Sequence, residues 1–344
     1  MKGKIAVLGA GSWGTALAVL LAKKGWLVWL WGRVEDGVEI IQHTRENQRF
    51  LPGVTIPSSV RVTADIAAAL TGAELVVLSV PSQAVRGVIA QARPFISRGT
   101  IVVNTAKGIE INSLLRLTEV LKQELPASMH QQIAVLSGPS HAEEVSRDLP
   151  TAIVSAAHQR QVAEYVQDVF MTPRFRVYTN PDVIGVELGG ALKNIIALSA
   201  GIADGLGYGD NSKAALITRG IREISRLGVA MGAEALTFAG LSGIGDLVVT
   251  CTSMHSRNRR AGIQLGQGKS LSEVLASIGM VVEGVETTRA AYRLAEKYGV
   301  EMPITNQTYR VLFYHLDPRE AVDNLMLRLK THEVEEVVRE RKDW

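Results

Sequence analysis

The sequence contains a single cysteine, Cys251, among its 344 residues, so no disulfide can form within one chain. A chain of this length can bury a sizeable core without disulfides. A lone cysteine is also compatible with a reducing cytoplasm. Because Cys251 is flanked by threonines, we interpret it as a small core residue.

An excess of charge of one sign is missing too. The formal net charge is +3, from 37 basic and 34 acidic residues. This bias is too small to indicate a nucleic-acid-binding protein and suits a local anion site equally well. No cluster of His, Cys and carboxylate residues has metal-ligand spacing, so we expect no metal site.

Long hydrophobic runs, repeats and low-complexity segments are also lacking. The apolar N-terminal stretch is interrupted by Gly9, Gly11 and Gly14, and no uninterrupted run approaches the roughly 20 residues that a membrane span needs. With 47% hydrophobic and 21% charged residues, the composition is that of an ordinary soluble protein. The length favours two domains.

What the sequence does have is a glycine-rich turn between a strand pattern and a helix pattern. The apolar residues 5–8 precede Gly9, Gly11 and Gly14, which are spaced G-x-G-x-x-G, and helical spacing begins at Trp13. The first glycine permits the turn, the second lets a pyrophosphate approach the backbone, and the third lets helix and strand pack closely. Phosphates would lie on the free N–H groups of the helix N-terminus. A second strand at 27–31 completes the motif, which predicts dinucleotide binding.

Arg33 directly follows that second strand. An acidic residue near this place usually holds the ribose hydroxyls of NAD, whereas an arginine suits the 2′-phosphate of NADP. We therefore expect both cofactors to be accepted, with NADPH at least as good as NADH. Glu35 and Asp36 lie close by in sequence. The alternative is that Arg33 is a solvated surface arginine.

The first 180 residues alternate between strand and helix patterns, which predicts a Rossmann-type, mostly parallel sheet with helices on both faces. Further strands are expected at 75–80, 100–104, 133–136, 151–156 and 175–179, and helices at 65–72, from 83, and at 114–125, with 42–62 irregular. Beyond 180 the pattern is helical, so we expect a dinucleotide-binding domain over 1–180 and an all-helical, substrate-binding domain over 181–344. Residues 333–341 read as an exposed amphipathic helix.

The most informative helix pattern runs from 186 to 205 and contains Lys193. Its helical neighbours are Gly189, Gly190, Ala197 and Gly201. Glycines inside a helix cost about 1 kcal/mol each against alanine, so we expect a ligand or the other domain to approach closely. A lysine there loses water, which lowers its pKa and suits it to general-base chemistry. The alternative is a surface lysine whose ammonium reaches solvent.

A second informative stretch runs from 243 to 262. Asp246 follows a glycine pair, and Ser256, Arg257 and Asn258 provide charged and neutral donors for a phosphate. Taken alone, a basic cluster of this kind is more often a solvated face. His141 is an alternative acid/base candidate, although we interpret it as a hydrogen-bonded structural histidine.

Taken together, these stretches resemble bacterial NAD(P)-dependent glycerol-3-phosphate dehydrogenases over nearly the whole chain. The matching segments, in order, are GAGSWGTALA at 9–18, KGIE at 107–110, SGPSHA at 137–142, LKNIIA at 192–197, GLGYGDN at 205–211, GDL at 245–247, TCTS at 250–253, SRNRR at 256–260 and VVEG at 281–284. The resemblance implies a cytoplasmic homodimer that makes glycerol 3-phosphate for glycerophospholipids, with no nucleic-acid partner and no integral membrane segment.

The resemblance also implies roles for individual residues, of which the proton acceptor Lys193 is the first. The positions that match nucleotide contacts, besides Gly9, Gly11 and Gly14, are Ser12, Trp13, Arg33, Lys107, Ala142, Arg257, Val281 and Glu283. The positions that match contacts to glycerol 3-phosphate are Lys107, Gly138, Ser140, Lys193, Asp246, Ser256, Arg257 and Asn258. Two other readings stay open: a two-domain dehydrogenase of β-hydroxy acids, and a nucleotide-binding redox sensor without catalysis.

Overall fold

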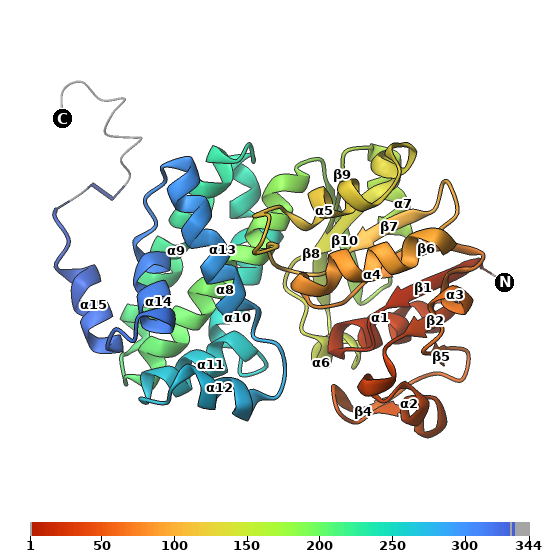
Figure 1. Ribbon diagram of the computed structural model, residues 1–344, viewed down its shortest axis with the longest axis horizontal. Helices are drawn as coiled ribbons and strands as arrows, with labels where there is room; N and C mark the ends of the chain where they lie inside the picture. The colour runs from red at the N-terminus through yellow and green to blue at the C-terminus, as the bar shows by residue number, and fades with distance from the viewer. Residues whose placement is uncertain (1, 331, 334–344) are drawn as a thin grey trace.

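The computed structural model describes residues 2–330, 332 and 333, which form a sheet-containing part and a helical part side by side (Figure 1). The main sheet has eight strands in the order β10-β9-β8-β7-β6-β1-β2-β5, and every neighbouring pair is parallel except β8 with β9. The strands are β1 Lys4–Leu8, β2 Leu27–Trp31, β5 Arg61–Thr63, β6 Ala73–Leu78, β7 Ile101–Asn104, β8 Ile133–Ser137, β9 Thr151–Ala157 and β10 Phe175–Asn180. The mostly parallel sheet expected from the sequence is confirmed.

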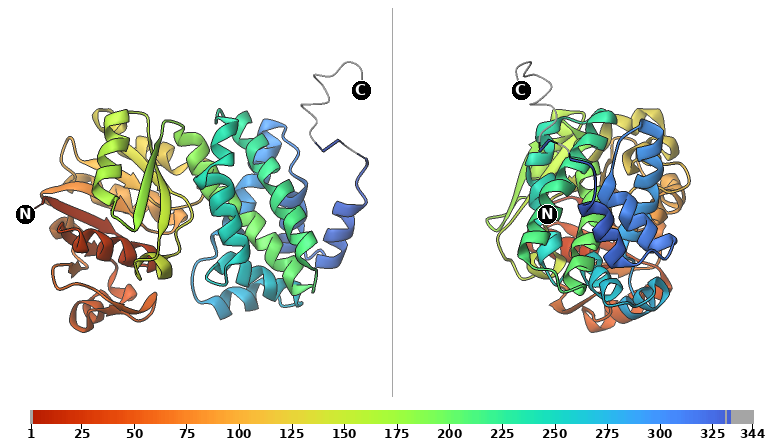
Figure 2. Two further views of the ribbon diagram at one scale, coloured as in Figure 1. Left: turned by 180° about the vertical axis from the view of Figure 1, so that it is seen from behind. Right: turned by 90° about the vertical axis from the view of Figure 1, so that its left-hand side faces the viewer.

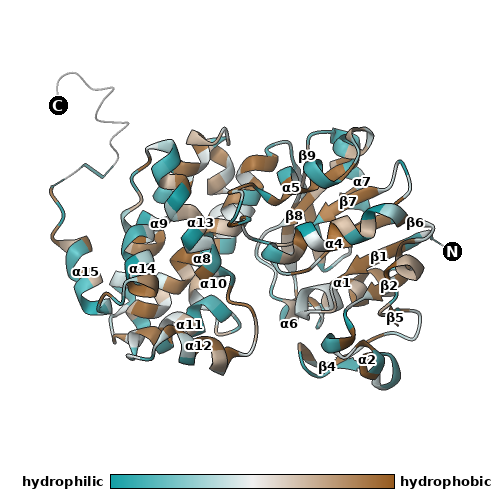
Figure 3. Cartoon of the chain, viewed as in Figure 1, coloured by the Kyte–Doolittle hydropathy of each residue, from teal (hydrophilic) through white to brown (hydrophobic). Residues whose placement is uncertain are grey.

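Strand β1 shows why the sheet carries helices on both faces. Ile5 and Val7 belong to one buried cluster, with residues of α1 and α7, while Ala6 and Leu8 belong to another, with residues of α3, α4 and α5. A strand that is buried on both faces reads as a continuous apolar run, as this one does (Figure 3). The helices of this part are α1 Ser12–Lys23, α2 Val38–Thr44, α3 Ile66–Leu70, α4 Val85–Ala92, α5 Leu117–Glu124, α6 Ala142–Val145 and α7 Arg160–Phe170.

The helical part is built around α8, Val183–Gly205, which begins where the Asp182 side chain accepts a hydrogen bond from the Gly185 N–H. By length and composition α8 could cross a membrane, but 94% of its apolar window is buried inside the chain, as in the core helix of a soluble protein. Figure 2 shows the other helices gathered around it. They are α9 Asp210–Ala230, α10 Asp246–Thr252, α11 Arg257–Gly266, α12 Leu271–Ile278, α13 Glu283–Tyr298, α14 Pro303–Phe313 and α15 Pro318–Met326.

The glycines of α8 are explained mainly by neighbouring helical segments rather than by a ligand. A Cβ on Gly189 would lie 2.4 Å from the Ser242 carbonyl oxygen, and one on Gly201 would lie 2.2 Å from that of Arg259. Among the three glycines near Lys193, only Gly190 lies against the sheet part, because a Cβ on it would lie 2.5 Å from Ser137 Oγ on β8. The expectation of a ligand or domain contact was therefore wrong for Gly189 and Gly201.

Two local expectations were also wrong. Residues 42–62 are not irregular: they include the end of α2, the antiparallel pair β3 Glu46–Asn47 and β4 Leu51–Thr55, and the start of β5. The helix expected from 114 begins only at Leu117, because Leu114 has a left-handed backbone with φ of 59°. The helix expected at 333–341 lies outside the described residues except for Glu333, which is in a bend.

Candidate active site

A cavity of about 780 Å³ lies between the two parts, a size typical of small-molecule and cofactor sites. The expected site residues that line it are Gly9, Gly11, Ser12, Trp13, Arg33, Lys107, Ser140, Ala142, Lys193, Ser256, Arg257, Asn258, Val281 and Glu283. The remaining three lie just behind this surface. Gly14 packs against Gly9, and Gly138 and Asp246 both bind the ammonium of Lys107. The fold thus brings residues that are up to 274 positions apart, from Gly9 to Glu283, to one cavity.

The glycine turn at one end of the cavity has the shape that a pyrophosphate requires. Gly9 has a φ of 119°, and a Cβ on Gly14 would lie 1.9 Å from the Gly9 carbonyl oxygen. Gly11 is the N-cap residue of α1, and a Cβ added to it would meet nothing within 4 Å. Among the described residues, the buried Trp13 Nε1 has no hydrogen-bond partner. Free N–H groups and an open approach fit the phosphates of a dinucleotide.

Arg33 lines the same end of the cavity but is bound to a carboxylate. Its Nε donates to Asp36 Oδ2 at 3.1 Å, and its Nη2 donates to Oδ1 at 2.9 Å. The side chain is two-thirds exposed. Its hydrogen bonds and ion pair with Asp36 raise the pKa of Arg33, and the same contacts hold the pKa of Asp36 below its usual range. A 2′-phosphate would have to compete with Asp36 for this guanidinium.

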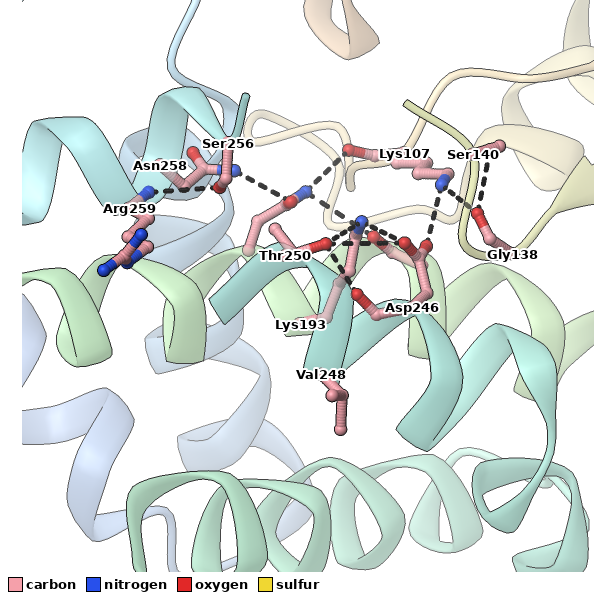
Figure 4. Close-up of polar contacts among 12 residues, drawn as sticks. Lys107, Gly138, Ser140, Lys193, Asp246, Val248, Thr250, Ser256, Asn258 and Arg259 are labelled. Carbon is pink, nitrogen blue, oxygen red and sulfur yellow. Dashed lines mark hydrogen bonds and ion pairs between the residues drawn. The ribbon is translucent and has the colours of Figure 1, made fainter. Parts of the chain in front are cut away.

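At the centre of the site, the carboxylate of Asp246 is shared by two lysines (Figure 4). Lys193 Nζ donates to Asp246 Oδ1 at 2.5 Å and to Thr250 Oγ1 at 2.6 Å. Lys107 Nζ donates to Asp246 Oδ2 at 2.7 Å and to the Gly138 carbonyl at 2.8 Å, an oxygen that Ser140 Oγ also contacts. Lys193 comes from α8, Asp246 from α10, and Lys107 from the loop after β7.

The charges around Asp246 set the protonation of Lys193 and of Asp246 itself. Burial and then the positive charge of Lys107 lower the pKa of Lys193 to about 8, against the opposing effect of Asp246. Burial alone would raise the pKa of Asp246, but the Lys107 and Lys193 ammonium groups hold it below its usual range. The fall expected for Lys193 is therefore present. A lysine that is partly neutral near physiological pH can accept or donate a proton.

The N-terminus of α11 forms the neighbouring wall. Ser256 caps the helix, with its Oγ accepting from the Arg259 N–H at 3.2 Å. Arg257 Nη1 donates to the Val281 carbonyl at 3.0 Å, which leaves other guanidinium N–H groups at the cavity. A helix N-terminus with an arginine in its first turn is suited to an anion such as a phosphate.

Asn258 and Glu283 both form hydrogen bonds to other residues of the chain. Asn258 Oδ1 accepts from the Gly284 N–H at 2.9 Å, and its Nδ2 donates to Asn194 Oδ1 at 2.9 Å. Asn258 therefore ties α11 to α13 and α8 and has one amide N–H left for a ligand. Glu283 accepts from the N–H of Ser82 at 2.9 Å and from its Oγ at 2.5 Å. That contact joins the helical part to the sheet part at the rim of the cavity.

His141 differs from the expectation of a hydrogen-bonded structural histidine. Its Nε2 is buried in the cavity wall with no hydrogen-bond partner among the described residues. The ring lies tilted against that of His255, with 5.7 Å between centroids. Burial and then the Lys193 charge lower the pKa of His141, which favours its neutral form. Cys251 is buried as expected, and burial raises the pKa of its thiol to about 12.

Two family models match the two parts of the chain. The model described as NAD-dependent glycerol-3-phosphate dehydrogenase N-terminus matches residues 4–163, and the corresponding C-terminus model matches residues 182–323. The chain belongs to this dehydrogenase family. The matched segments contain the glycine turn, both lysines, Asp246 and the start of α11.

Individual family members are similar over almost their whole length. The chain is 61% identical to glycerol-3-phosphate dehydrogenase [NAD(P)+] of Pelotomaculum thermopropionicum, covering 98% of this chain and 97% of the relative. It is 62% identical to the protein of that name from Desulfitobacterium hafniense, covering 97% and 94%. The crystal structure of glycerol-3-phosphate dehydrogenase from Coxiella burnetii superposes with a TM-score of 0.91 at 43% identity, covering 95% of this chain and 99% of that one.

Three further residues, which were not predicted from the sequence, complete the site: Thr250, Ser82 and Asn194. Thr250 contacts Lys193, and its position one helical turn after Asp246 was a usable signal. Ser82, which binds Glu283, and Asn194, which binds Asn258, carry no such signal, because their partners are 201 and 64 positions away. Such contacts arise from tertiary packing alone.

Proposed function

We propose that this chain is an NAD(P)-dependent glycerol-3-phosphate dehydrogenase, an oxidoreductase that interconverts sn-glycerol 3-phosphate and dihydroxyacetone phosphate. The observation that carries the proposal is a buried lysine with a lowered pKa, Lys193, in a cavity with a glycine turn at one end and the α11 N-terminus in its wall. Relatives more than 60% identical carry this enzyme's name, which supports the same reading.

Lys193 would move the proton of the reaction. In the reducing direction, its ammonium donates a proton to the oxygen on the substrate's second carbon as that carbon receives hydride. In the oxidising direction, the neutral amine accepts the proton from the alcohol. Asp246 and Thr250 hold Nζ in place through contacts of 2.5 and 2.6 Å. Lys107 balances the charge on Asp246 and faces the same cavity, where it is proposed to contact both ligands.

The phosphate of the substrate would lie at the start of α11. Arg257 supplies charged donors, and the first-turn N–H groups and the remaining amide N–H of Asn258 supply neutral ones. Ser256 shapes this turn as its N-cap. Ser140 and Gly138 would border the substrate on the side of Lys107, whose ammonium binds the Gly138 carbonyl.

The cofactor would be held by the turn formed by Gly9, Gly11 and Gly14 and by the side chains that line the cavity beyond it. Those side chains and backbone groups are Ser12, Trp13, Arg33, Lys107, Ala142, Arg257, Val281 and Glu283. A bound nicotinamide dinucleotide supplies or accepts the hydride. We propose that both NADH and NADPH serve, with NADPH at least as good, because Arg33 directly follows β2, where an arginine suits the 2′-phosphate of NADP.

The domain roles, the localisation and the oligomeric state are proposed by analogy with the family. We propose a dinucleotide-binding domain over 1–180, a substrate-binding domain over 181–344, and a cytoplasmic homodimer that supplies glycerol 3-phosphate for phospholipids. A dehydrogenase of β-hydroxy acids would bind a carboxylate where this site offers Arg257 and the start of α11. A redox sensor without catalysis would have no use for the buried Lys193 and Asp246.

An absorbance assay of the purified protein tests the function directly. Dihydroxyacetone phosphate and a β-keto acid are each offered with NADH and with NADPH, and oxidation of the nicotinamide is followed. We expect turnover with dihydroxyacetone phosphate and not with the β-keto acid. Turnover with the β-keto acid alone would overturn the proposal in favour of the second dehydrogenase class.

Lys193→Met tests the proposed proton transfer. Methionine keeps the length and apolar volume of the side chain but cannot carry the proton, so cofactor affinity should be kept. General acid–base catalysis is typically worth about 10²- to 10⁴-fold, and we expect kcat to fall at least that far. If the variant keeps half of the wild-type turnover, Lys193 is not the acid/base, and His141 becomes the candidate to test.

A further inference from the structure

The loop that carries Lys107 is a closed hairpin rather than a free connection. Between β7 and α5, Ile109 and Arg116 form an antiparallel bridge, and the Glu110 N–H donates to the Leu115 carbonyl at 3.0 Å. Lys107 stands two residues before this bridge. The position of its ammonium therefore depends on where the base of the hairpin, at Ile109 and Arg116, is fixed.

The hairpin is fixed to the helical part by a carboxylate of α8. Glu187 accepts from the Thr118 N–H at 2.9 Å, from Thr118 Oγ1 at 2.5 Å and from Arg116 Nη1 at 2.7 Å. The carboxylate thus caps the first turn of α5 and pairs with the residue that closes the hairpin. Its side chain is 5% exposed, and burial raises the pKa of Glu187 against the effect of Arg116.

A second contact holds the hairpin against the same helix. Ile109 is buried in the core of the helical part, in a cluster that includes Leu188 and Leu192 of α8. The backbone is also held, because Gln83 Nε2 donates to the Ile109 carbonyl at 2.8 Å. Glu187 lies six residues before Lys193, which is roughly 9 Å along a rigid helix. One helix therefore fixes both the catalytic lysine and the base of the hairpin that bears Lys107.

We propose that Glu187 is a positioning residue: by fixing the hairpin at Arg116 and Thr118, it holds the Lys107 ammonium on Asp246 beside Lys193. This inference rests on the proposed function for its consequence in catalysis. No role in the site was expected for Glu187, Arg116 or Thr118 from the sequence.

The consequence is electrostatic and follows from the shared carboxylate. Burial and the charge of Lys107 lower the pKa of Lys193, and the charge of Asp246 raises it. The nearby Cys251 thiol stays neutral in this range, because burial raises its pKa to about 12. The His141 imidazole, whose own pKa is lowered by Lys193, also faces this lysine. If the hairpin loosens, Lys107 withdraws its charge from Asp246. Lys193 then loses a repulsive neighbour and pairs with a less neutralised carboxylate, so its pKa rises.

Glu187→Gln tests the positioning role. The glutamine oxygen can still accept from the Thr118 N–H, but its amide N–H₂ faces Arg116 and Thr118 Oγ1 instead of accepting from them. We expect the pKa of Lys193 to rise by about 0.5 to 1 unit. It is read in two ways: from the pH profile of kcat with dihydroxyacetone phosphate, and by NMR titration of ¹³Cε-labelled lysine without ligands. The Lys193 signal is identified by its loss in Lys193→Met.

The chain offers a matched control in Glu223. This buried carboxylate also caps a helix, because it accepts from the Ile304 N–H at 2.6 Å and from Thr305 at the start of α14. Glu223→Gln should alter stability without moving the Lys193 titration, since α14 carries none of the groups that act on Lys193. Thr118→Val, which removes only the hydroxyl contact, is the milder second variant in case Glu187→Gln does not fold, and it should shift the titration in the same direction.

A double-mutant cycle decides whether the effect passes through Lys107. In a Lys107→Met background, Glu187→Gln should cause no further rise in the pKa of Lys193. A shift of equal size in both backgrounds, or a changed melting temperature with an unmoved titration, would overturn the proposal. The NMR titration needs no turnover, so inactivity of the wild type toward dihydroxyacetone phosphate would remove the proposed function without deciding the role of Glu187.

Discussion

The carboxylate of Asp246 serves two ammonium groups at once, and this sets the pH range in which Lys193 can change its charge. Since burial and Lys107 lower the pKa of Lys193 to about 8, its acid form prevails below that pH and its base form above it. We expect kcat for the reduction of dihydroxyacetone phosphate to fall as the pH rises through about 8, and kcat for the oxidation of glycerol 3-phosphate to rise there. Steady-state pH profiles in both directions check this, and parallel profiles would contradict it.

The Arg33–Asp36 pair makes cofactor choice a competition within the protein. Arg33→Asp should shift the ratio of kcat/KM for NADPH and NADH toward NADH, because it replaces attraction with like-charge repulsion of the 2′-phosphate. Asp36→Asn is the control of opposite sign, since it frees the guanidinium that Asp36 now binds at 2.9 Å. A ratio that neither substitution changes would mean that Arg33 has no contact with the cofactor.

At this scale, the sequence predicted what depends on near neighbours. The small residues one turn away from Lys193 indicated a crowded lysine with a lowered pKa, and the structure confirms both. It could not predict that Lys107 shares Asp246, because the two are 139 positions apart. It also misjudged His141, because the hydrogen bonding of an imidazole depends on groups that only the fold brings near.

Among the elements, the contact of α8 with α11 leaves no room for side chains where glycines meet. A Cβ on Gly262 would lie 2.1 Å from the Leu198 carbonyl oxygen. Alanine normally improves a helix interior, but here Gly262→Ala should push α11 away and lower the free energy of unfolding by about 1–3 kcal/mol. The Michaelis constant for dihydroxyacetone phosphate should rise as well, because α11 begins at the proposed phosphate site. Denaturant titration and steady-state kinetics measure the two effects.

The matched control for this substitution lies on α4. Gly87 is exposed on that helix, and a Cβ there would meet nothing within 4 Å. Gly87→Ala should therefore stabilise the protein by up to about 1 kcal/mol, as helix propensity alone predicts. Equal effects of the two substitutions would show that packing against α8 is not what requires Gly262.

The strands of the main sheet except β5 were placed from sequence with small errors at their ends, because burial on both faces produces continuous apolar runs. The segment 42–62 gave no such signal. Its pairing depends on Asn47, whose Nδ2 donates to the Ala10 carbonyl and to Thr15 Oγ1, both at 2.8 Å. A strand of two residues that is held by a distant helix and turn leaves no periodicity in the sequence to read.

For the whole molecule, buried carboxylates make stability depend on pH. Burial raises the pKa of Glu223 to about 7 in the folded protein, against an ordinary value of 4.5. Between these values the folded state binds more protons than the unfolded state, so the free energy of unfolding falls as the pH rises from about 4.5 to 7. Comparing wild type with Glu223→Gln isolates this group. Between pH 5 and 8, the wild type should lose about 2.5 kcal/mol more than the variant in urea titrations. Equal pH dependence of the two proteins would contradict this.

The division into a sheet part and a helical part could be predicted, because strand signals stop near 180. The way in which the two parts join could not. The contacts across the junction connect residues 201 positions apart, as between Ser82 and Glu283, and 71 apart, as between Arg116 and Glu187. No local pattern in a sequence encodes such pairs.

The insertion of Ile109 into the helical core has a consequence for exchanging parts between relatives. A chimaera joined at residue 180 would take its hairpin from one parent and the core that receives it from another, although neither the sheet nor the helices had been altered. The unit that can be transplanted with the helices therefore includes residues 105–118, which belong by sequence to the other half. We expect chimaeras that keep this segment with its own α8 to fold and turn over, and those that divide the two to be lost to aggregation.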